Sequence, residues 1–153
     1  GHAVHVLGGL GVARISYNEE TNSYRYQALR GDPLQIARII EAVKRKGKMP
    51  DDGYVADQVW FEALKSHRYP DVIFRLYQGL NGLVKNRADI LVSFRDNFVY
   101  GSKLFEVYDK LVPVVAIHGG LAAAQSEGFL MSTAREAPLY IRAREVRNYF
   151  ENH

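Results

Sequence analysis

The feature that most constrains this chain is a short apolar run, Val114 to Ile117, which ends on His118 and two glycines. A continuous run rich in β-branched residues is typical of a strand buried on both faces of a sheet. Open α/β sheets usually bind ligands at the carboxyl ends of such strands, and Gly119 and Gly120 allow the backbone to turn tightly there. The run therefore predicts a core strand with an imidazole at its functional end.

The size and composition of the chain are those of one folded domain. Its 153 residues are 47% hydrophobic and 24% charged, and a chain of this length buries about two thirds of the surface that it exposes when unfolded. No stretch approaches the roughly 20 apolar residues of a membrane span. The sequence has no cysteine, which excludes disulfides, thiolate catalysis and cysteine zinc sites. Gly1-His2 resembles the remnant of an expression tag, and the abrupt start suggests a fragment of a larger protein.

The charge distribution does not favour nucleic-acid recognition. The net charge is +3, and the dense basic run lies where a helix is expected to end. Cations at that position are stabilised by the negative end of the helix dipole. The run has no interleaved aromatic residues and matches no nucleic-acid motif. We therefore expect no nucleic-acid partner. The run consists of Lys44, Arg45, Lys46 and Lys48.

The first 30 residues predict an antiparallel hairpin. Val12 to Tyr17 and Ser23 to Leu29 are alternating runs separated by a polar turn, Asn18 to Asn22. Gly8 to Gly11 is glycine-rich, but its spacing does not match a phosphate-binding fingerprint, so we expect a turn there.

Three helices are expected to follow. Asp32 and Pro33 are good residues for a helix start, and Gly47 is a good terminator. A second helix is predicted from Ala56 to Ser66, and Pro70 with Asp71 opens a third. The apolar face of the first helix consists of Ile36, Ile39, Ile40 and Val43. That of the second consists of Val59, Trp60, Ala63 and Leu64, and that of the third of Ile73, Leu76, Tyr77 and Leu80.

The second half of the chain predicts alternating strands and helices. Ile90 to Phe94 has the pattern of a buried strand, a helical segment begins at Gly101, and an amphipathic helix runs from Arg142 to Phe150. Val146, Tyr149 and Phe150 are its expected anchors. The predicted fold class is therefore α/β, with a partly parallel sheet flanked by helices and an N-terminal antiparallel β-hairpin. We treat residues 1–153 as one domain.

The order of several segments resembles a known family. The resemblance covers most of Tyr24 to Phe150 and is to the C-terminal portion of type I phosphodiesterase and nucleotide pyrophosphatase-like members of the alkaline phosphatase superfamily. The segments are Tyr24-Arg25-Tyr26 through Gly31-Asp32-Pro33-Leu34, Trp60-Phe61-Glu62-Ala63, Tyr69-Pro70-Asp71, Ala88-Asp89-Ile90-Leu91-Val92-Ser93, and His118-Gly119-Gly120-Leu121 with Gln125 and Phe129-Leu130-Met131.

The resemblance implies a phosphate ester hydrolase with two zinc ions, in which His118 is one metal ligand. It also implies an alkaline-phosphatase-like sheet. The family's nucleophile and its other metal ligands lie upstream, and no matching element occurs in this chain. Ile117 and Gly120 also depart from the family pattern, which often has a small polar residue and a serine at these positions. A catalytic zinc needs about three protein ligands, so we expect the chain to be inactive by itself.

Other interpretations of the same residues are open. The chain could be a stand-alone binding or assembly module that dimerises through an exposed sheet edge. His67 is expected to form structural hydrogen bonds at a corner between two helices. A triad could be drawn from Ser126 or Ser132 with His118 and Asp96 or Asp109, but no nucleophile-elbow pattern surrounds either serine. His2, His5 and His153 lie at or near the ends of the chain and make a poor metal site.

Overall fold

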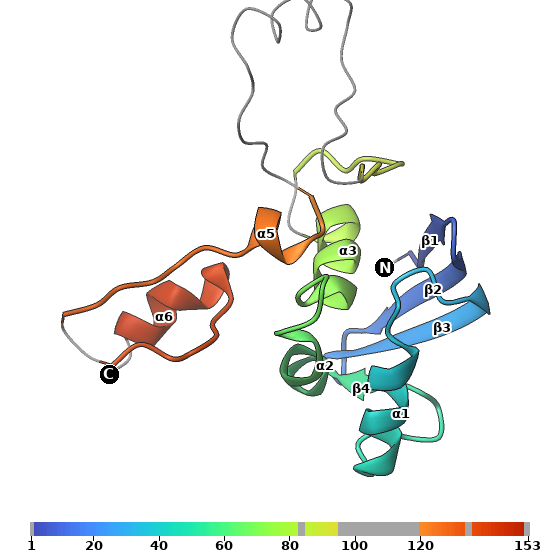
Figure 1. The fold of residues 1–153 in the computed structure, drawn as a ribbon, viewed down its shortest axis with the longest axis horizontal. Helices are drawn as coiled ribbons and strands as arrows, with labels where there is room; N and C mark the ends of the chain where they lie inside the picture. The colour runs from blue at the N-terminus through green and yellow to red at the C-terminus, as the bar shows by residue number, and fades with distance from the viewer. Residues whose placement is uncertain (1, 83–84, 95–119, 134–135, 152–153) are drawn as a thin grey trace, which may run out of the picture.

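An antiparallel sheet forms the framework of the molecule. A computed structural model describes residues 2–82, 85–94, 120–133 and 136–151 (Figure 1). The strand order is β1-β2-β3-β4, and each strand pairs antiparallel with the next. The predicted hairpin is confirmed, and a short strand before it, which the sequence did not predict, extends the sheet by one strand. The strands are β1 (Val4–Gly8), β2 (Gly11–Asn18), β3 (Ser23–Gly31) and β4 (Val55–Ala56).

Helices pack against this sheet and make the protein an α/β protein. The helix α3 (Val72–Asn81) contacts the first three strands, and α2 (Asp57–Leu64) contacts β3 and β4. The helix α1 (Ala37–Arg45) packs on α2. The remaining helical segments lie further along the chain: α5 (Ala123–Ser126), the 3₁₀ helix η1 (Ala143–Glu145) and α6 (Val146–Glu151). No helix in the described part of the chain has the length and apolar character needed to cross a membrane.

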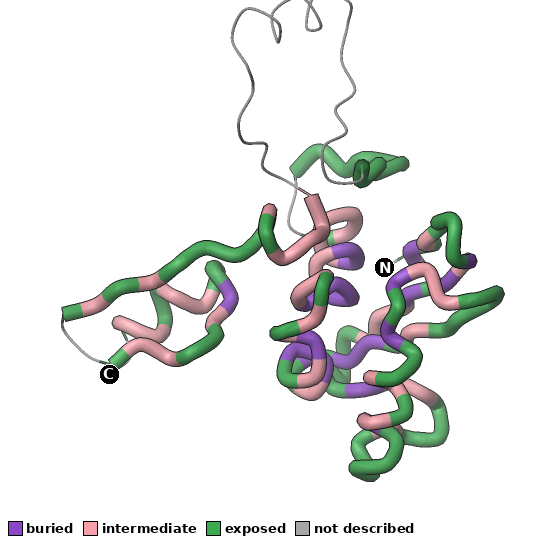
Figure 2. The backbone as a smooth tube through the Cα atoms, in the orientation of Figure 1, coloured by how far each residue is buried: buried purple, intermediate pink, exposed green. Residues whose placement is uncertain are grey.

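The hydrophobic core lies between the sheet and the helices α2 and α3. Figure 2 shows the buried residues gathered there, whereas residues 85–94 are exposed throughout. The rings of Tyr17, Tyr24 and Tyr77 form a cluster with centroid distances of 4.6 to 5.6 Å, and tilted or edge-on aromatic pairs of this kind are favourable. The largest fully buried side chains are those of Trp60, Tyr24, Ile15, Ile36, Leu64, Ile73, Val55 and Val72.

The first helix begins later than the sequence suggested. The Asp32 carboxylate accepts hydrogen bonds from the backbone amides of Ile36 (3.1 Å) and Ala37 (2.9 Å), so Asp32 does cap free amides, as predicted. The intervening residues form a turn in which Gln35 has a φ of 58°, and Pro33 is therefore not the first helical residue. The end of α1 is as predicted. Gly47 has a φ of 65° and donates to Lys44 O, and Lys48 N donates to Val43 O, which is a Schellman motif.

One prediction for the second half is wrong, and another is confirmed. Residues 90–94 form no strand in the structure, and Ile90, Val92 and Phe94 are 80%, 66% and 50% exposed. The predicted final helix is confirmed: η1 and α6 follow one another from Ala143 to Glu151. Its expected anchors are half-buried, and the buried residue of this segment is Arg142. The predicted strand at 114–117 and the helical segment from residue 101 lie outside the described residues. Parallel pairing in the sheet therefore stays a prediction.

Candidate functional site

Hydrogen bonds join the segment that follows His118 to the first turn of α3. His118 itself lies outside the described residues, and the description resumes at Gly120. The Arg75 guanidinium donates hydrogen bonds to Gly120 O (3.0 Å) and Leu121 O (3.1 Å). It also donates to Ser126 Oγ (3.1 Å) and Pro70 O (3.1 Å). One arginine therefore joins the start of α3 to both ends of the segment 120–126.

Two further hydrogen bonds complete this attachment. Ala123 N donates to Arg68 O at 2.9 Å, and the Ser126 hydroxyl donates to Ala122 O at 2.5 Å. Burial lowers the pKa of Arg75, and the nearby Asp71 carboxylate opposes that shift. Because a guanidinium ordinarily titrates above pH 12, Arg75 stays charged at neutral pH. The residues after His118 are thus held by a cationic side chain and by backbone contacts.

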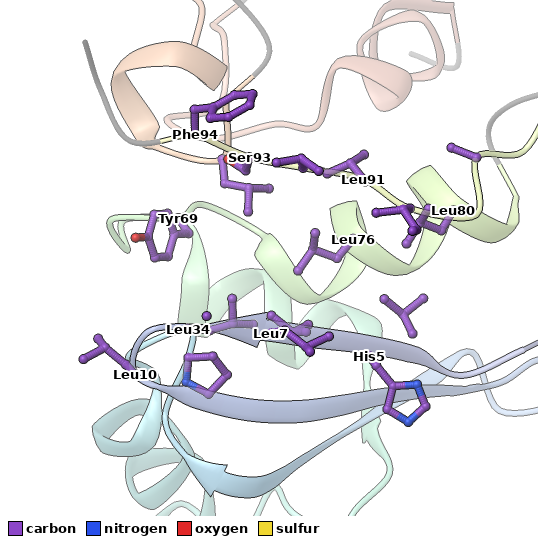
Figure 3. Close-up of a pocket in the computed structure, with 18 of the residues that line it drawn as sticks. His5, Leu7, Leu10, Leu34, Tyr69, Leu76, Leu80, Leu91, Ser93 and Phe94 are labelled. Atoms are coloured by element: carbon purple, nitrogen blue, oxygen red, sulfur yellow. The ribbon is translucent and has the colours of Figure 1, made fainter. Parts of the chain in front are cut away.

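A cavity adjoins this segment. It has a volume of about 1280 Å³ and lies between β1, α3 and residues 87–94, with Leu121, Ala122 and Gln125 in its wall (Figure 3). Its polar lining includes His5, Arg68, Arg87 and Asp89. Arginine side chains carry paired donors that suit a phosphate or carboxylate group. The apolar side of the lining includes Leu76 and Leu80 of α3.

The described residues do not by themselves form a metal site. Among residues 2–82, 85–94, 120–133 and 136–151, no group of three or more histidine, aspartate or glutamate side chains is placed to hold a metal ion. A catalytic zinc takes about three protein ligands. The described part of the chain therefore does not fit a zinc centre without ligands from elsewhere.

His67 has the structural role that the sequence predicted. Its Nδ1 accepts a hydrogen bond from Tyr69 N at 3.1 Å, and its Nε2 lies 3.3 Å from Gln35 O. Because Nδ1 accepts, the ring proton is on Nε2, which donates to the carbonyl of Gln35. These bonds hold the connection between α2 and α3 against the loop before α1.

The proposed triad finds no further support. The Ser126 hydroxyl is already bonded to Ala122 O and to Arg75. Asp96, Asp109 and His118 lie outside the described residues, so the triad stays untested. Sequence analysis missed the role of Arg75. Three of its four acceptors lie 45 to 51 residues later in the chain, and no local pattern indicates such distant partners. A single arginine on a helix usually faces solvent.

Together, these features define an α/β protein in which a segment following a histidine borders a cavity with two arginines. No protein-family model, curated protein or solved structure matches this chain.

Proposed function

We propose that this chain is the C-terminal portion of a metal-dependent phosphoric ester hydrolase of the phosphodiesterase and nucleotide pyrophosphatase type. In this proposal His118 is one zinc ligand at the end of the predicted strand 114–117, and the complete sheet is partly parallel and alkaline-phosphatase-like. The sequence resemblance supports this assignment. The structural observation that carries it is the attachment of residues 120–126 to α3 through Arg75, beside the arginine-lined cavity.

The chemistry of the side chains agrees with this assignment. A neutral imidazole nitrogen is a good zinc ligand. Arg68 and Arg87 in the cavity supply guanidinium groups, which recognise phosphate oxygens through paired hydrogen bonds. The nucleophile and the remaining zinc ligands would come from sequence outside this chain. The chain alone is then expected to bind zinc weakly and to have no hydrolase activity.

A second candidate is a non-catalytic module that forms a homodimer. The observation that favours it is the edge of the sheet at β1, which pairs with β2 alone among the described strands. Leu7 on this strand is 76% exposed. An uncovered strand edge with an apolar side chain is a template for pairing with a second copy.

Zinc titration by calorimetry tests the first candidate. The wild-type chain is compared with His118→Ala and, as a control at a histidine outside the cavity lining, with His67→Ala, and each is assayed on a nitrophenyl phosphodiester. We expect weak zinc binding that His118→Ala abolishes and His67→Ala preserves, with no turnover in any sample. Zinc binding that is unchanged in His118→Ala would refute the ligand role. Tight stoichiometric binding or His118-dependent turnover would refute the view that the site is incomplete.

Sedimentation analysis separates the second candidate from the first. A dimer that Leu7→Lys dissociates, together with zinc binding that does not depend on His118, would favour the module. A monomer at all concentrations tested would exclude it.

A further inference from the structure

Arg142 is enclosed by two carboxylates. Its side chain is 6% exposed, and it donates four hydrogen bonds. Two go to Asp57, from Nη1 to Oδ2 at 2.5 Å and from Nη2 to Oδ1 at 2.8 Å. Two go to Asp71, from Nε to Oδ2 at 2.6 Å and from Nη2 to Oδ1 at 2.9 Å. Each carboxylate therefore binds the guanidinium in a bidentate manner.

Two aromatic rings lie close to the same guanidinium. The Cζ atom of Arg142 lies 4.7 Å from the ring centroid of Phe61 and 4.2 Å from that of Phe74. Hydrogen bonds to two carboxylates and contacts with two aromatic rings suit a planar cation with several donors. An ammonium group has neither the planar shape nor the paired donors. We call the side chains of Asp57, Phe61, Asp71 and Phe74 the guanidinium socket.

The socket belongs to the helices α2 and α3, which lie far from Arg142 in sequence. Asp57 is the first residue of α2, and Asp71 precedes α3 with a φ of 49°. The Asp71 side chain does not cap α3, because its oxygens are directed to Arg142. Burial raises the pKa of Asp71, and the hydrogen bonds and charge of Arg142 oppose that rise. Without Arg142, two buried carboxylates would be left without the cation that both of them bind.

The C-terminal arm, residues 136–151, is held against α2 and α3 mainly through the hydrogen bonds of Arg142 to Asp57 and Asp71. Arg142 is the one buried residue among the described residues of 127–151. Among the helices and strands of the described chain, α6 packs against η1 alone, and the arm extends away from the sheet in Figure 1. Arg144 adds an ion pair to Asp57 at 3.6 Å and a cation–π contact with Phe74, and Lys65 makes a cation–π contact with Tyr140 of the arm.

We propose that Asp57, Phe61, Asp71 and Phe74 form a guanidinium-binding site whose resident ligand is Arg142. The C-terminal arm can then dissociate from this site. When the arm opens, the socket is free to take another guanidinium, such as the side chain of an arginine in a partner peptide. This inference does not depend on the hydrolase proposal, since it does not use His118, Arg75 or the arginines that line the cavity.

The test removes the resident ligand and offers a small one. In Arg142→Ala, hydrogen exchange of residues 136–151 should accelerate by more than about tenfold. Methylguanidinium at millimolar concentration should raise the melting temperature of Arg142→Ala and leave the wild type unchanged. Methylammonium at the same concentration is the control and should have no effect. An equal response to both cations, or no response, would overturn the proposal.

Two further variants keep the test decisive. Arg147→Ala removes an exposed arginine of the same arm, which pairs with Glu151, and should leave hydrogen exchange unchanged. If Arg142→Ala fails to fold, methylguanidinium must restore its circular dichroism spectrum. In Asp57→Asn/Asp71→Asn/Arg142→Ala the socket is neutral, and the response to methylguanidinium should disappear. If the protection of residues 136–151 against hydrogen exchange depends on protein concentration, the arm of one copy binds the socket of another. That result would contradict binding within one chain.

Discussion

The indole Nε1 of Trp60 donates a hydrogen bond of 3.0 Å to the backbone carbonyl oxygen of Tyr24, and both side chains are 1% exposed. This bond joins α2 to β3 across 36 residues of sequence. Trp60→Phe removes the donor, leaves a buried acceptor with one partner fewer and opens a cavity. We expect a loss of about 2 to 4 kcal/mol in the free energy of unfolding.

Urea denaturation followed by circular dichroism measures this loss, because Trp60 is the single tryptophan of the chain and its fluorescence disappears in the variant. Tyr140→Phe changes an exposed aromatic residue and serves as the control. Equal stability of Trp60→Phe and the wild type would contradict the assigned role.

A glycine in the first hairpin is required by its surroundings. Gly11 has a φ of 145°, and a Cβ atom there would lie 2.0 Å from the backbone oxygen of Arg30. Gly11→Ala should therefore destabilise the fold by about 1 to 3 kcal/mol or more. A Cβ atom on Gly79 in α3 would meet no atom within 4 Å, and Gly79→Ala should stabilise by up to about 1 kcal/mol. Melting temperatures that shift in the same direction would refute this contrast.

The Asp32 carboxylate replaces two backbone acceptors at the start of α1. Asp32→Ala leaves the amides of Ile36 and Ala37 without this partner, and we expect a loss of about 1 kcal/mol. Hydrogen exchange at Ile36 and Ala37 should accelerate in the same variant. Asp51→Ala, which changes an exposed acid in the next loop, is the control. Unchanged exchange at both amides would show that the carboxylate does not cap the helix.

Ionisation of Tyr24 is expected to make the free energy of unfolding depend on pH in the alkaline range. Burial raises its pKa from 10.0 to about 12, although the hydrogen bond from Gln78 opposes the rise. The unfolded chain then loses this proton at lower pH than the folded chain does. The stabilisation is present below pH 10 and is lost as the pH rises towards about 12, by about 3 kcal/mol in total. Urea denaturation across this range, compared with Tyr24→Phe, measures it, and identical slopes would contradict the raised pKa.

Local sequence patterns predicted the elements whose stabilising contacts are close in sequence. The apolar spacing of Trp60 and Leu64, and of Ile73 and Tyr77, correctly indicated the inward faces of α2 and α3. Asp32 was correctly identified as a cap, but its reach to Ala37 moved the helix start, because the chain turns between them. The strand β1 was missed because it is short and lies next to residues that resembled a tag.

Patterns failed where partners are distant in sequence. Residues 90–94 have the composition of a buried strand, yet the structure exposes them, because composition does not specify what covers a segment. Arg142 was predicted as the first residue of an amphipathic helix, and no local signal indicated carboxylates 71 and 85 residues away. His118, on which the function depends most, lies outside the described residues, so its role stays a prediction.

The order of the strands has a consequence for synthesis on the ribosome. Each strand pairs with its neighbour in the chain, and the buried hydrophobic cluster of the described residues ends at Tyr77, so this part of the fold can form before Arg142 is translated. Asp57 and Asp71 are then without their cationic partner until Arg142 has been translated. We expect chains that end before Arg142 to be cut by protease near Asp57 and Asp71, and the 153-residue chain to be protected there. A residue translated later would thus balance the charge of Asp57 and Asp71.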